Sequence, residues 1–124
     1  MGRLLPSART FGHAFRGLGF LFQTERNARF HLSSAVGVIV CGLALDLPRI
    51  EWMILVLVMM AVVSLEAVNT AIEILCNVVS PEHNEAIGRA KDVAAGAVLI
   101  AAIAAVVIAG LVFGHRLLAI AASP

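Results

Sequence analysis

The sequence predicts an all-α membrane protein, with an N-terminal amphipathic surface helix followed by three transmembrane helices. Hydrophobic residues make up 60% of the chain and charged residues only 14%, which leaves too little polar surface for a water-soluble globule. Three apolar runs, at 28–47, 52–79 and 93–113, reach or approach the ~20 residues that a helix needs to cross a bilayer. At 124 residues, the whole chain, 1–124, is expected to form a single integral-membrane domain.

Residues 1–27 are expected to form the interfacial helix. Four apolar residues at helical spacing share one face of it: Phe11, Phe15, Leu18 and Phe22. Arg9 and Arg16 fall on the opposite face, so the arginines would meet headgroups or phosphates while the apolar face enters the bilayer. Ser7 is predicted to cap the start of this helix. A membrane anchor without any chemistry is equally compatible with the pattern.

The placement of basic residues predicts the orientation of the chain in the membrane. The arginines before the first span are Arg3, Arg9, Arg16, Arg26 and Arg29. Arg89 and Lys91 lie between the second and third spans, whereas the other side of the membrane carries only Arg49 and Arg116. The positive-inside rule therefore predicts that the N-terminus and the 80–92 loop are cytosolic.

The second span contains the most unusual residues of the chain. Glu66, Asn69 and Glu73 follow one another at positions i, i+3 and i+7, so they share one face of a helix that is otherwise almost purely apolar. An ionisable residue at the middle of a membrane helix costs about 2.5–3.5 kcal/mol on insertion scales. Such a cost is tolerated mainly where the polar face meets a protein interior, a metal or a substrate, and this triplet is predicted to be the functional core.

Helix rise predicts how deep these residues lie. If Trp52 marks the outer interface, Glu66 lies roughly 21 Å further in and Glu73 roughly 32 Å, close to the inner boundary of the hydrocarbon. Glu25, just before the first span, is expected at the same level as Glu73. Ser80-Pro81-Glu82 is predicted to start the next helix, with a cap, a first-turn proline and an acid near the positive helix end.

Phosphoryl transfer to a membrane lipid would use this layer of polar residues. Glu25 and Glu73 offer hard oxygen ligands, which suit Mg²⁺ held jointly with substrate phosphates. Lys91 and Arg89, with the N-terminal arginines, are positioned to neutralise a polyphosphate. Glu66, which lies deeper, is a candidate base for the hydroxyl of a lipid alcohol. No nucleic-acid partner is expected.

Two other classes of function remain open on the residues alone. A small oligomeric transporter would use Glu66 as a proton-coupled binding carboxylate, but it would not need Glu73 or the pair Lys91 and Asp92 at the cytosolic mouth. A non-catalytic membrane adaptor would leave the buried acids unexplained. Consumption of ATP upon addition of a lipid alcohol distinguishes the kinase from both.

Three blocks of the chain closely resemble the small prokaryotic diacylglycerol kinase and undecaprenol kinase family. They are residues 66–73, residues 88–92 and residues 25–31, and the resemblance extends over nearly the whole chain. It implies a homotrimer with active sites at subunit contacts, in the bacterial inner (plasma) membrane. It also implies ATP as the phosphoryl donor, with Mg²⁺.

The resemblance also implies roles for individual residues. Glu66 matches the proton acceptor, Glu25 and Glu73 match the residues that hold Mg²⁺ with ATP, and Asn69 and Lys91 match active-site positions. Nucleotide contacts are implied for His13, Arg16, Asn77, Glu82, His83, Asn84, Lys91 and Asp92. Lipid contacts are implied for Asn27, Ala28, Arg29, Phe30 and His31, together with Glu66.

The chain departs from the family pattern at two positions. Asn77 stands where many members carry Asp, and His13 stands where some members carry an aromatic residue. The block at 25–31 is nearer to undecaprenol kinases than to the diacylglycerol-specific branch, which favours undecaprenol as the acceptor, with diacylglycerol as the alternative.

Overall fold

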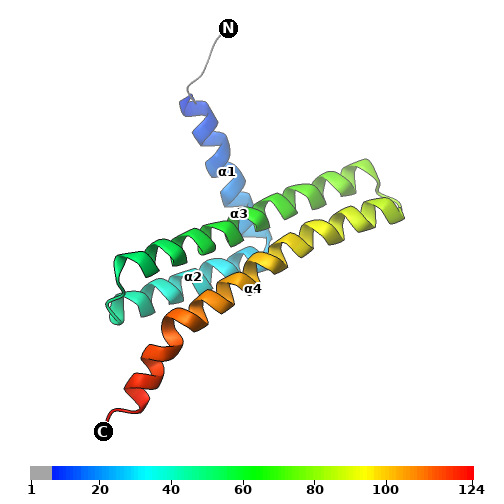
Figure 1. Cartoon of the computed structure of the whole chain (residues 1–124). Helices are drawn as coiled ribbons and strands as arrows, with labels where there is room; N and C mark the ends of the chain where they lie inside the picture. The colour runs from blue at the N-terminus through cyan, green and yellow to red at the C-terminus, as the bar shows by residue number, and fades with distance from the viewer. Residues whose placement is uncertain (1–6) are drawn as a thin grey trace.

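The computed structural model describes residues 7–124, and within that range the chain forms four helices and no strand (Figure 1). They are α1 (Ala8–Thr24), α2 (Arg26–Ala44), α3 (Arg49–Val79) and α4 (Glu85–Ala121). The predicted fold class, a surface helix followed by three membrane helices, is confirmed. The first six residues of the predicted surface helix, including Arg3, lie outside the described part of the chain.

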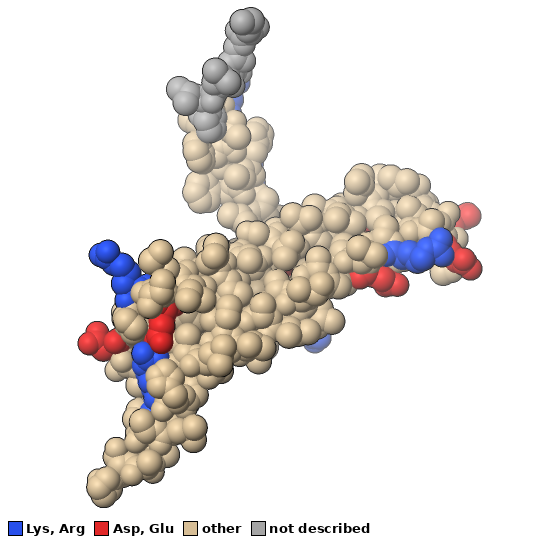
Figure 2. Space-filling view, in the orientation of Figure 1, with Lys and Arg blue, Asp and Glu red and all other residues tan. Residues whose placement is uncertain are grey.

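Helices α2, α3 and α4 run alongside one another, and each is long and apolar enough to cross a membrane. Figure 2 shows that the charged side chains gather towards the two ends of this bundle, while the surface between them is almost entirely uncharged. Large apolar side chains such as Leu57, Ile100 and Val106 are more than two-thirds exposed around that middle zone. An apolar band of this kind is the surface that a bilayer covers.

Helix α1 leaves the bundle at a sharp corner after Thr24 and points away from it (Figure 1). Its apolar side chains Phe11, Phe15 and Leu18 are exposed, as an interfacial helix requires, and only Leu21 is buried. Ser7 occupies the predicted N-cap position, but its hydroxyl pairs with the Thr10 hydroxyl at 3.3 Å rather than with a backbone N–H. The capping position was therefore predicted correctly, and the capping bond was not.

The level of the corner corrects the expected depth of Glu25. Helix α2 is 19 residues long, about 28 Å, and counting the same rise along α3 from Arg49 reaches the turn that follows Glu66. The corner therefore lies level with Glu66. Glu73, seven residues later in α3, lies about 10 Å further along the helix axis. Figure 1 shows the remainder of α3 and the start of α4 extending well past the corner as a helix pair. Residues 67–79 of α3, which the sequence assigns to the second span, pack against α4 beyond the corner.

The other end of the bundle is closed by a tight turn between α2 and α3. Gly42 lets the indole of Trp52 lie against the backbone, because a Cβ at this position would be 2.6 Å from the Trp52 ring. Next to it, the buried core contains Ala35, Leu47, Leu55, Met59 and Val112. An ion pair joins α3 to α4 at this end, with Arg116 Nη2 and Glu51 Oε2 2.7 Å apart and both side chains about four-fifths buried. The contact fixes which turns of the two helices meet.

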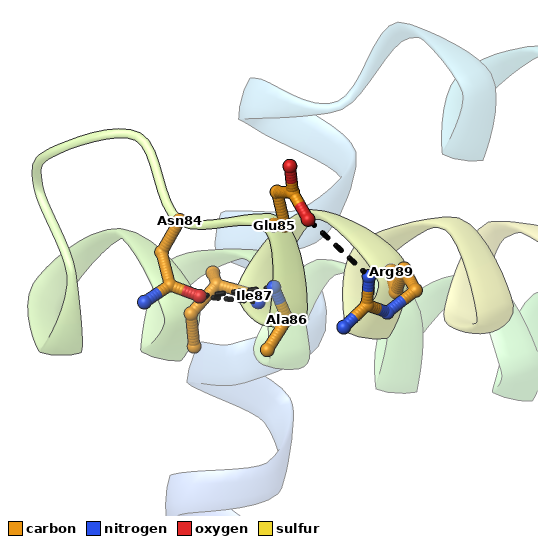
Figure 3. A network of polar contacts seen from close by, with 5 residues as sticks. All are labelled: Asn84, Glu85, Ala86, Ile87 and Arg89. Atoms are coloured by element: carbon orange, nitrogen blue, oxygen red, sulfur yellow. Dashed lines mark hydrogen bonds and ion pairs between the residues drawn. The ribbon is translucent and has the colours of Figure 1, made fainter.

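Helix α4 starts later than the sequence predicted. Ser80 is the C-terminal cap of α3, and its hydroxyl donates to the Glu82 carbonyl at 3.1 Å, so Ser80-Pro81-Glu82 forms a loop. The cap of α4 is Asn84, whose Oδ1 accepts from the backbone N–H of Ala86 at 2.9 Å and of Ile87 at 3.2 Å (Figure 3). Asn is among the residues that best satisfy the free N–H groups of a first turn. The expectation that Ser80 caps this helix was wrong.

Candidate functional site

Glu66 lies at the centre of the polar site, on the face of α3 that is turned into the protein. Its side chain is 3% exposed, and Thr70, one turn later on the same face, is 5% exposed. Glu25, Glu73 and His31 lie close enough for their charges to act on the Glu66 carboxyl. The structure therefore brings together acids that are far apart in the sequence, around one buried carboxyl group.

The α1–α2 corner brings Glu25 to this place. Glu25 is the single residue between the two helices, in extended conformation (φ −97°, ψ 114°), and it serves as the C-cap of α1 and the N-cap of α2. Its N–H donates to the Leu21 carbonyl at 2.8 Å. The partly exposed carboxylate thus lies at the bundle surface, level with Glu66.

A second group of polar residues joins α3 to α4 beyond the corner. Lys91 Nζ donates to Asn77 Oδ1 at 3.1 Å and lies 3.8 Å from Glu73 Oε1. The Lys91 side chain is 34% exposed and that of Glu73 is 50% exposed, so both remain open to a ligand from solvent. Lys91 is therefore held by the neutral amide of Asn77 and by a longer ion pair with Glu73.

Other predicted residues lie near this group without contacting it. Asp92, Glu82 and His83 are exposed and form no side-chain hydrogen bond or ion pair among residues 7–124. Asn84 is occupied as the cap of α4, and Arg89 pairs with Glu85 at 3.7 Å, with both side chains largely exposed to solvent (Figure 3). Exposed pairs of this kind contribute little to stability.

His13 and Arg16 are not brought to the site within a single chain. Their side chains contact each other one helical turn apart on the exposed part of α1 that points away from the bundle (Figure 1). Neither residue makes a hydrogen bond or ion pair with α3 or α4 in the part of the chain that the structure describes.

An apolar groove of about 250 Å³ opens between α2, α3 and α4. Its lining begins at Phe30 and His31, beside Glu66, and continues along α3 through Val62 and Leu55. Asn27 and Ala28 precede Phe30 in the first turn of α2 without lining the groove, and Ala28 is buried. The groove thus extends from the uncharged middle of the bundle to Val62, one helical turn before Glu66, and to His31, whose charge acts on the Glu66 carboxyl group.

The donor atoms of the site suit a hard cation that is only partly held by protein. No group of three or more His, Cys, Asp or Glu side chains within residues 7–124 is arranged to enclose a metal ion. Glu25 and Glu73, whose charges both act on the Glu66 carboxyl group, supply single carboxylates that are at least partly open to solvent. Mg²⁺ is typically bound in this way, through one or two carboxylates with water and substrate phosphates completing the shell.

Two features of the site were missed by the sequence analysis. Thr70 is buried one turn after Glu66, and its place at i+4 on the same face was the available signal. Arg29 was expected to meet the lipid, and a second contact was not foreseen: its Nη1 donates to the carbonyls of Phe22 and Gln23 at the end of α1. A hydrogen bond of that kind depends on the corner geometry, for which the sequence offered no signal.

Fold and site together define a small helical membrane protein with a carboxylate-rich polar site at one end of its bundle. The family of prokaryotic diacylglycerol kinases matches residues 12–113. The chain is 41% identical over 109 residues to the undecaprenol kinase of Bacillus subtilis (strain 168), covering 88% of this chain and 89% of that protein. The chain belongs to the prokaryotic diacylglycerol kinase family.

Two further relatives carry the name diacylglycerol kinase. The protein from Synechocystis sp. is 41% identical over 102 residues, which cover 82% of this chain and 58% of that longer protein. The protein from Escherichia coli (strain K12) is 33% identical over 96 residues, covering 77% of this chain and 79% of that protein. The family and its membrane setting are thereby established, while the roles predicted for individual residues remain predictions.

Proposed function

We propose that this protein is a lipid kinase that transfers the γ-phosphoryl group of ATP to the hydroxyl of a membrane lipid alcohol. The observation that carries the proposal is the buried Glu66, which lies close enough to two other carboxylates for their charges to act on it and one helical turn from the apolar groove at Val62. A buried carboxyl group inside a membrane bundle is a functional residue by default. Membership of the prokaryotic diacylglycerol kinase family supports the same reaction.

Each side of the site would hold one substrate. A lipid alcohol entering from the bilayer would place its tail in the groove and its hydroxyl beside Glu66, which would accept the proton during attack. The exposed Lys91, held by Asn77, would bind phosphate oxygens from the aqueous side. Asn69, on the same face of α3, would orient the reacting groups between them.

Glu25 and Glu73 would hold Mg²⁺ together with the phosphates of ATP. The bound ion would neutralise charge on the transferring phosphoryl group. Lys91 now lies 3.8 Å from Glu73, so the same lysine that would bind phosphate also compensates this carboxylate when no ligand is present. The two carboxylates and the lysine would thereby stay close together without forming a closed coordination shell of protein ligands.

The working form is proposed to be a homotrimer in the inner membrane, with α1 on its cytosolic surface. His13 and Arg16 belong to α1, which points away from the bundle of its own chain (Figure 1), so they would meet the nucleotide at the site of a neighbouring copy. We expect the nucleotide to contact four further exposed residues in the α3–α4 loop and the start of α4: Glu82, His83, Asn84 and Asp92.

Undecaprenol is the favoured acceptor. The relative from Bacillus subtilis that carries the name undecaprenol kinase matches nearly the full length of both chains. The groove itself is uncharged along α3 and α4 and accepts an unbranched or a prenyl tail on physical grounds alone. The choice between the two lipids therefore rests on the relatives.

The test is a phosphorylation assay with undecaprenol and diacylglycerol side by side in mixed micelles. Radiolabel from the γ-position of ATP should appear in the lipid phase, and only in the presence of a lipid alcohol. Preference for diacylglycerol would contradict the assignment of undecaprenol as the acceptor, but it would still support the assignment of the protein as a lipid kinase. No labelled lipid with either alcohol, together with proton-coupled solute uptake into vesicles, would instead support a transporter that uses Glu66.

A further inference from the structure

The guanidinium of Arg29, on α2, forms hydrogen bonds with the C-terminal end of α1. Its Nη1 donates to the Gln23 carbonyl at 2.9 Å and to the Phe22 carbonyl at 3.1 Å. These carbonyls belong to the last turn of α1, where no further helical N–H is available to them. Helix α1 has no basic residue of its own in that turn. Arg29 therefore supplies from α2 the cation that stabilises the negative end of α1.

The same corner depends on few other contacts. Glu25 is the only residue between the two helices, and the Arg29 N–H donates to the Glu25 carbonyl at 3.2 Å. Leu21 is the one buried side chain of α1. The direction in which α1 leaves the bundle is therefore held by the Glu25 backbone, by Leu21, by the two bonds of Arg29 and by the contact of α1 with α3.

The bonds of Arg29 also leave Glu25 free. The two residues are four apart at the start of α2, a spacing at which Glu and Arg commonly form an ion pair. The guanidinium is turned to the carbonyls of α1 instead, and Glu25 has no ion pair among residues 7–124. Its carboxylate remains available beside Glu66.

We propose that Arg29 is a positioning residue of the site: by holding the last carbonyls of α1, it fixes the α1–α2 corner and places the Glu25 carboxylate beside Glu66. This proposal rests on the proposed function, in which Glu25 binds the metal–nucleotide. It is distinct from the lipid contact that the family resemblance implied for Arg29, because it assigns Nη1 of the guanidinium to the carbonyls of α1.

Three variants separate the alternatives. Arg29→Met keeps the length of the side chain and removes its donors, and Arg29→Lys keeps the charge without the planar fork. Arg26→Met is the matched control, since Arg26 is exposed in the same turn and makes no hydrogen bond or ion pair in the described range. Amide hydrogen exchange over residues 18–25 in detergent micelles measures directly how stable the α1–α2 corner is. Exchange should be faster in Arg29→Met, intermediate in Arg29→Lys and unchanged in Arg26→Met.

Steady-state kinetics of lipid phosphorylation then measure how each Arg29 variant affects the site. Arg29→Met should lower kcat about tenfold, the order expected for losing charge-assisted hydrogen bonds, and raise the Mg²⁺ requirement at constant KM for the lipid. Arg29→Lys should recover part of the rate. In a Glu25→Gln background, Arg29→Met should cause no further loss of kcat, because its effect acts through Glu25.

Several results would overturn the proposal. They are a change confined to the KM for the lipid, a loss that adds fully to that of Glu25→Gln, or faster exchange with unaltered kinetics. Exchange needs no turnover, so unchanged exchange in Arg29→Met overturns the role of Arg29 alone. Absence of lipid phosphorylation by the unaltered chain overturns the proposed function, and faster exchange in the variant then still supports the contact with α1.

Discussion

Glu66 combines two properties that are rarely found together, an ionisable side chain and 3% exposure inside an apolar bundle. Neither a hydrogen bond nor an ion pair within residues 7–124 compensates it. A buried carboxyl group without a partner is costly, so its surroundings are explained best by a ligand that completes them. In the proposed reaction this ligand is the hydroxyl of the lipid.

Glu66→Gln should therefore reduce the rate and leave nucleotide binding nearly unchanged. The amide keeps the size of the side chain but accepts no proton, and general-base catalysis is typically worth about 10²–10⁴-fold, so kcat should fall by that order. The KM for ATP should change little, since the predicted nucleotide contacts lie elsewhere. Steady-state kinetics with Glu85→Gln as the control checks this. Near-normal kcat in a folded variant would make Glu66 structural.

Glu73→Gln should act through the metal. The variant removes one of the two carboxylates proposed to hold Mg²⁺, and it also removes the acid 3.8 Å from Lys91. Because the ion has so few protein ligands, the variant should need a higher Mg²⁺ concentration for half-maximal activity, or it should lose turnover altogether. A titration of activity with Mg²⁺ at fixed ATP measures this. The same half-saturating Mg²⁺ concentration in both proteins would exclude Glu73 as a ligand.

At the level of the helices, the turn between α2 and α3 illustrates close packing. Gly42→Ala would bring a Cβ to 2.6 Å from Trp52 Cη2 and 3.0 Å from Leu47 Cδ1, so the indole must shift. Overpacking of this kind costs about 1–3 kcal/mol, and the variant should unfold at a lower temperature in detergent. Gly37→Ala, in the same helix with nothing within 4 Å of the added Cβ, should be neutral or slightly stabilised. Equal unfolding temperatures in the two variants would show that Trp52 moves without cost.

The helices also show what could be predicted from the sequence. Length and apolar character were enough for three membrane helices, because a bilayer demands about 20 apolar residues whatever they contact. Glu66, Asn69 and Glu73 could be placed on one face by spacing alone. The start of α4 could not be settled in the same way, since both Ser80 and Asn84 are capping residues. The structure uses Ser80 to end α3, which leaves Asn84 for α4.

The level of Glu25 was missed for a related reason. Apolar residues such as Val78 and Val79 continue to the end of α3, so the sequence placed the membrane boundary there, while the structure leaves them exposed beyond the corner. The pair of α3 and α4 extends past the corner at which α1 turns aside (Figure 1). The site therefore straddles the corner, with Glu66 beside the apolar groove and Lys91 on the aqueous side.

At the scale of the whole molecule, a single chain holds most of the predicted site but leaves α1 apart from it. Glu25, Glu66, Glu73 and Lys91 gather between α2, α3 and α4. His13 and Arg16 lie on the part of α1 that points away (Figure 1). Either these two residues have no role in the reaction, or α1 of one copy completes the site of another.

Mixing two inactive variants distinguishes these cases. Glu66→Gln damages the bundle part of the site and Arg16→Ala damages the α1 part, so each homo-oligomer should be nearly inactive. If α1 serves a neighbouring copy in a closed ring, co-folding equal amounts should leave about a quarter of the sites with both residues intact, and activity should recover towards that level. A double variant carrying both changes, mixed with itself, controls for refolding and should stay inactive. Activity in the mixture no higher than the mean of the two variants would mean that each chain acts alone, and full activity of Arg16→Ala by itself would remove α1 from the site.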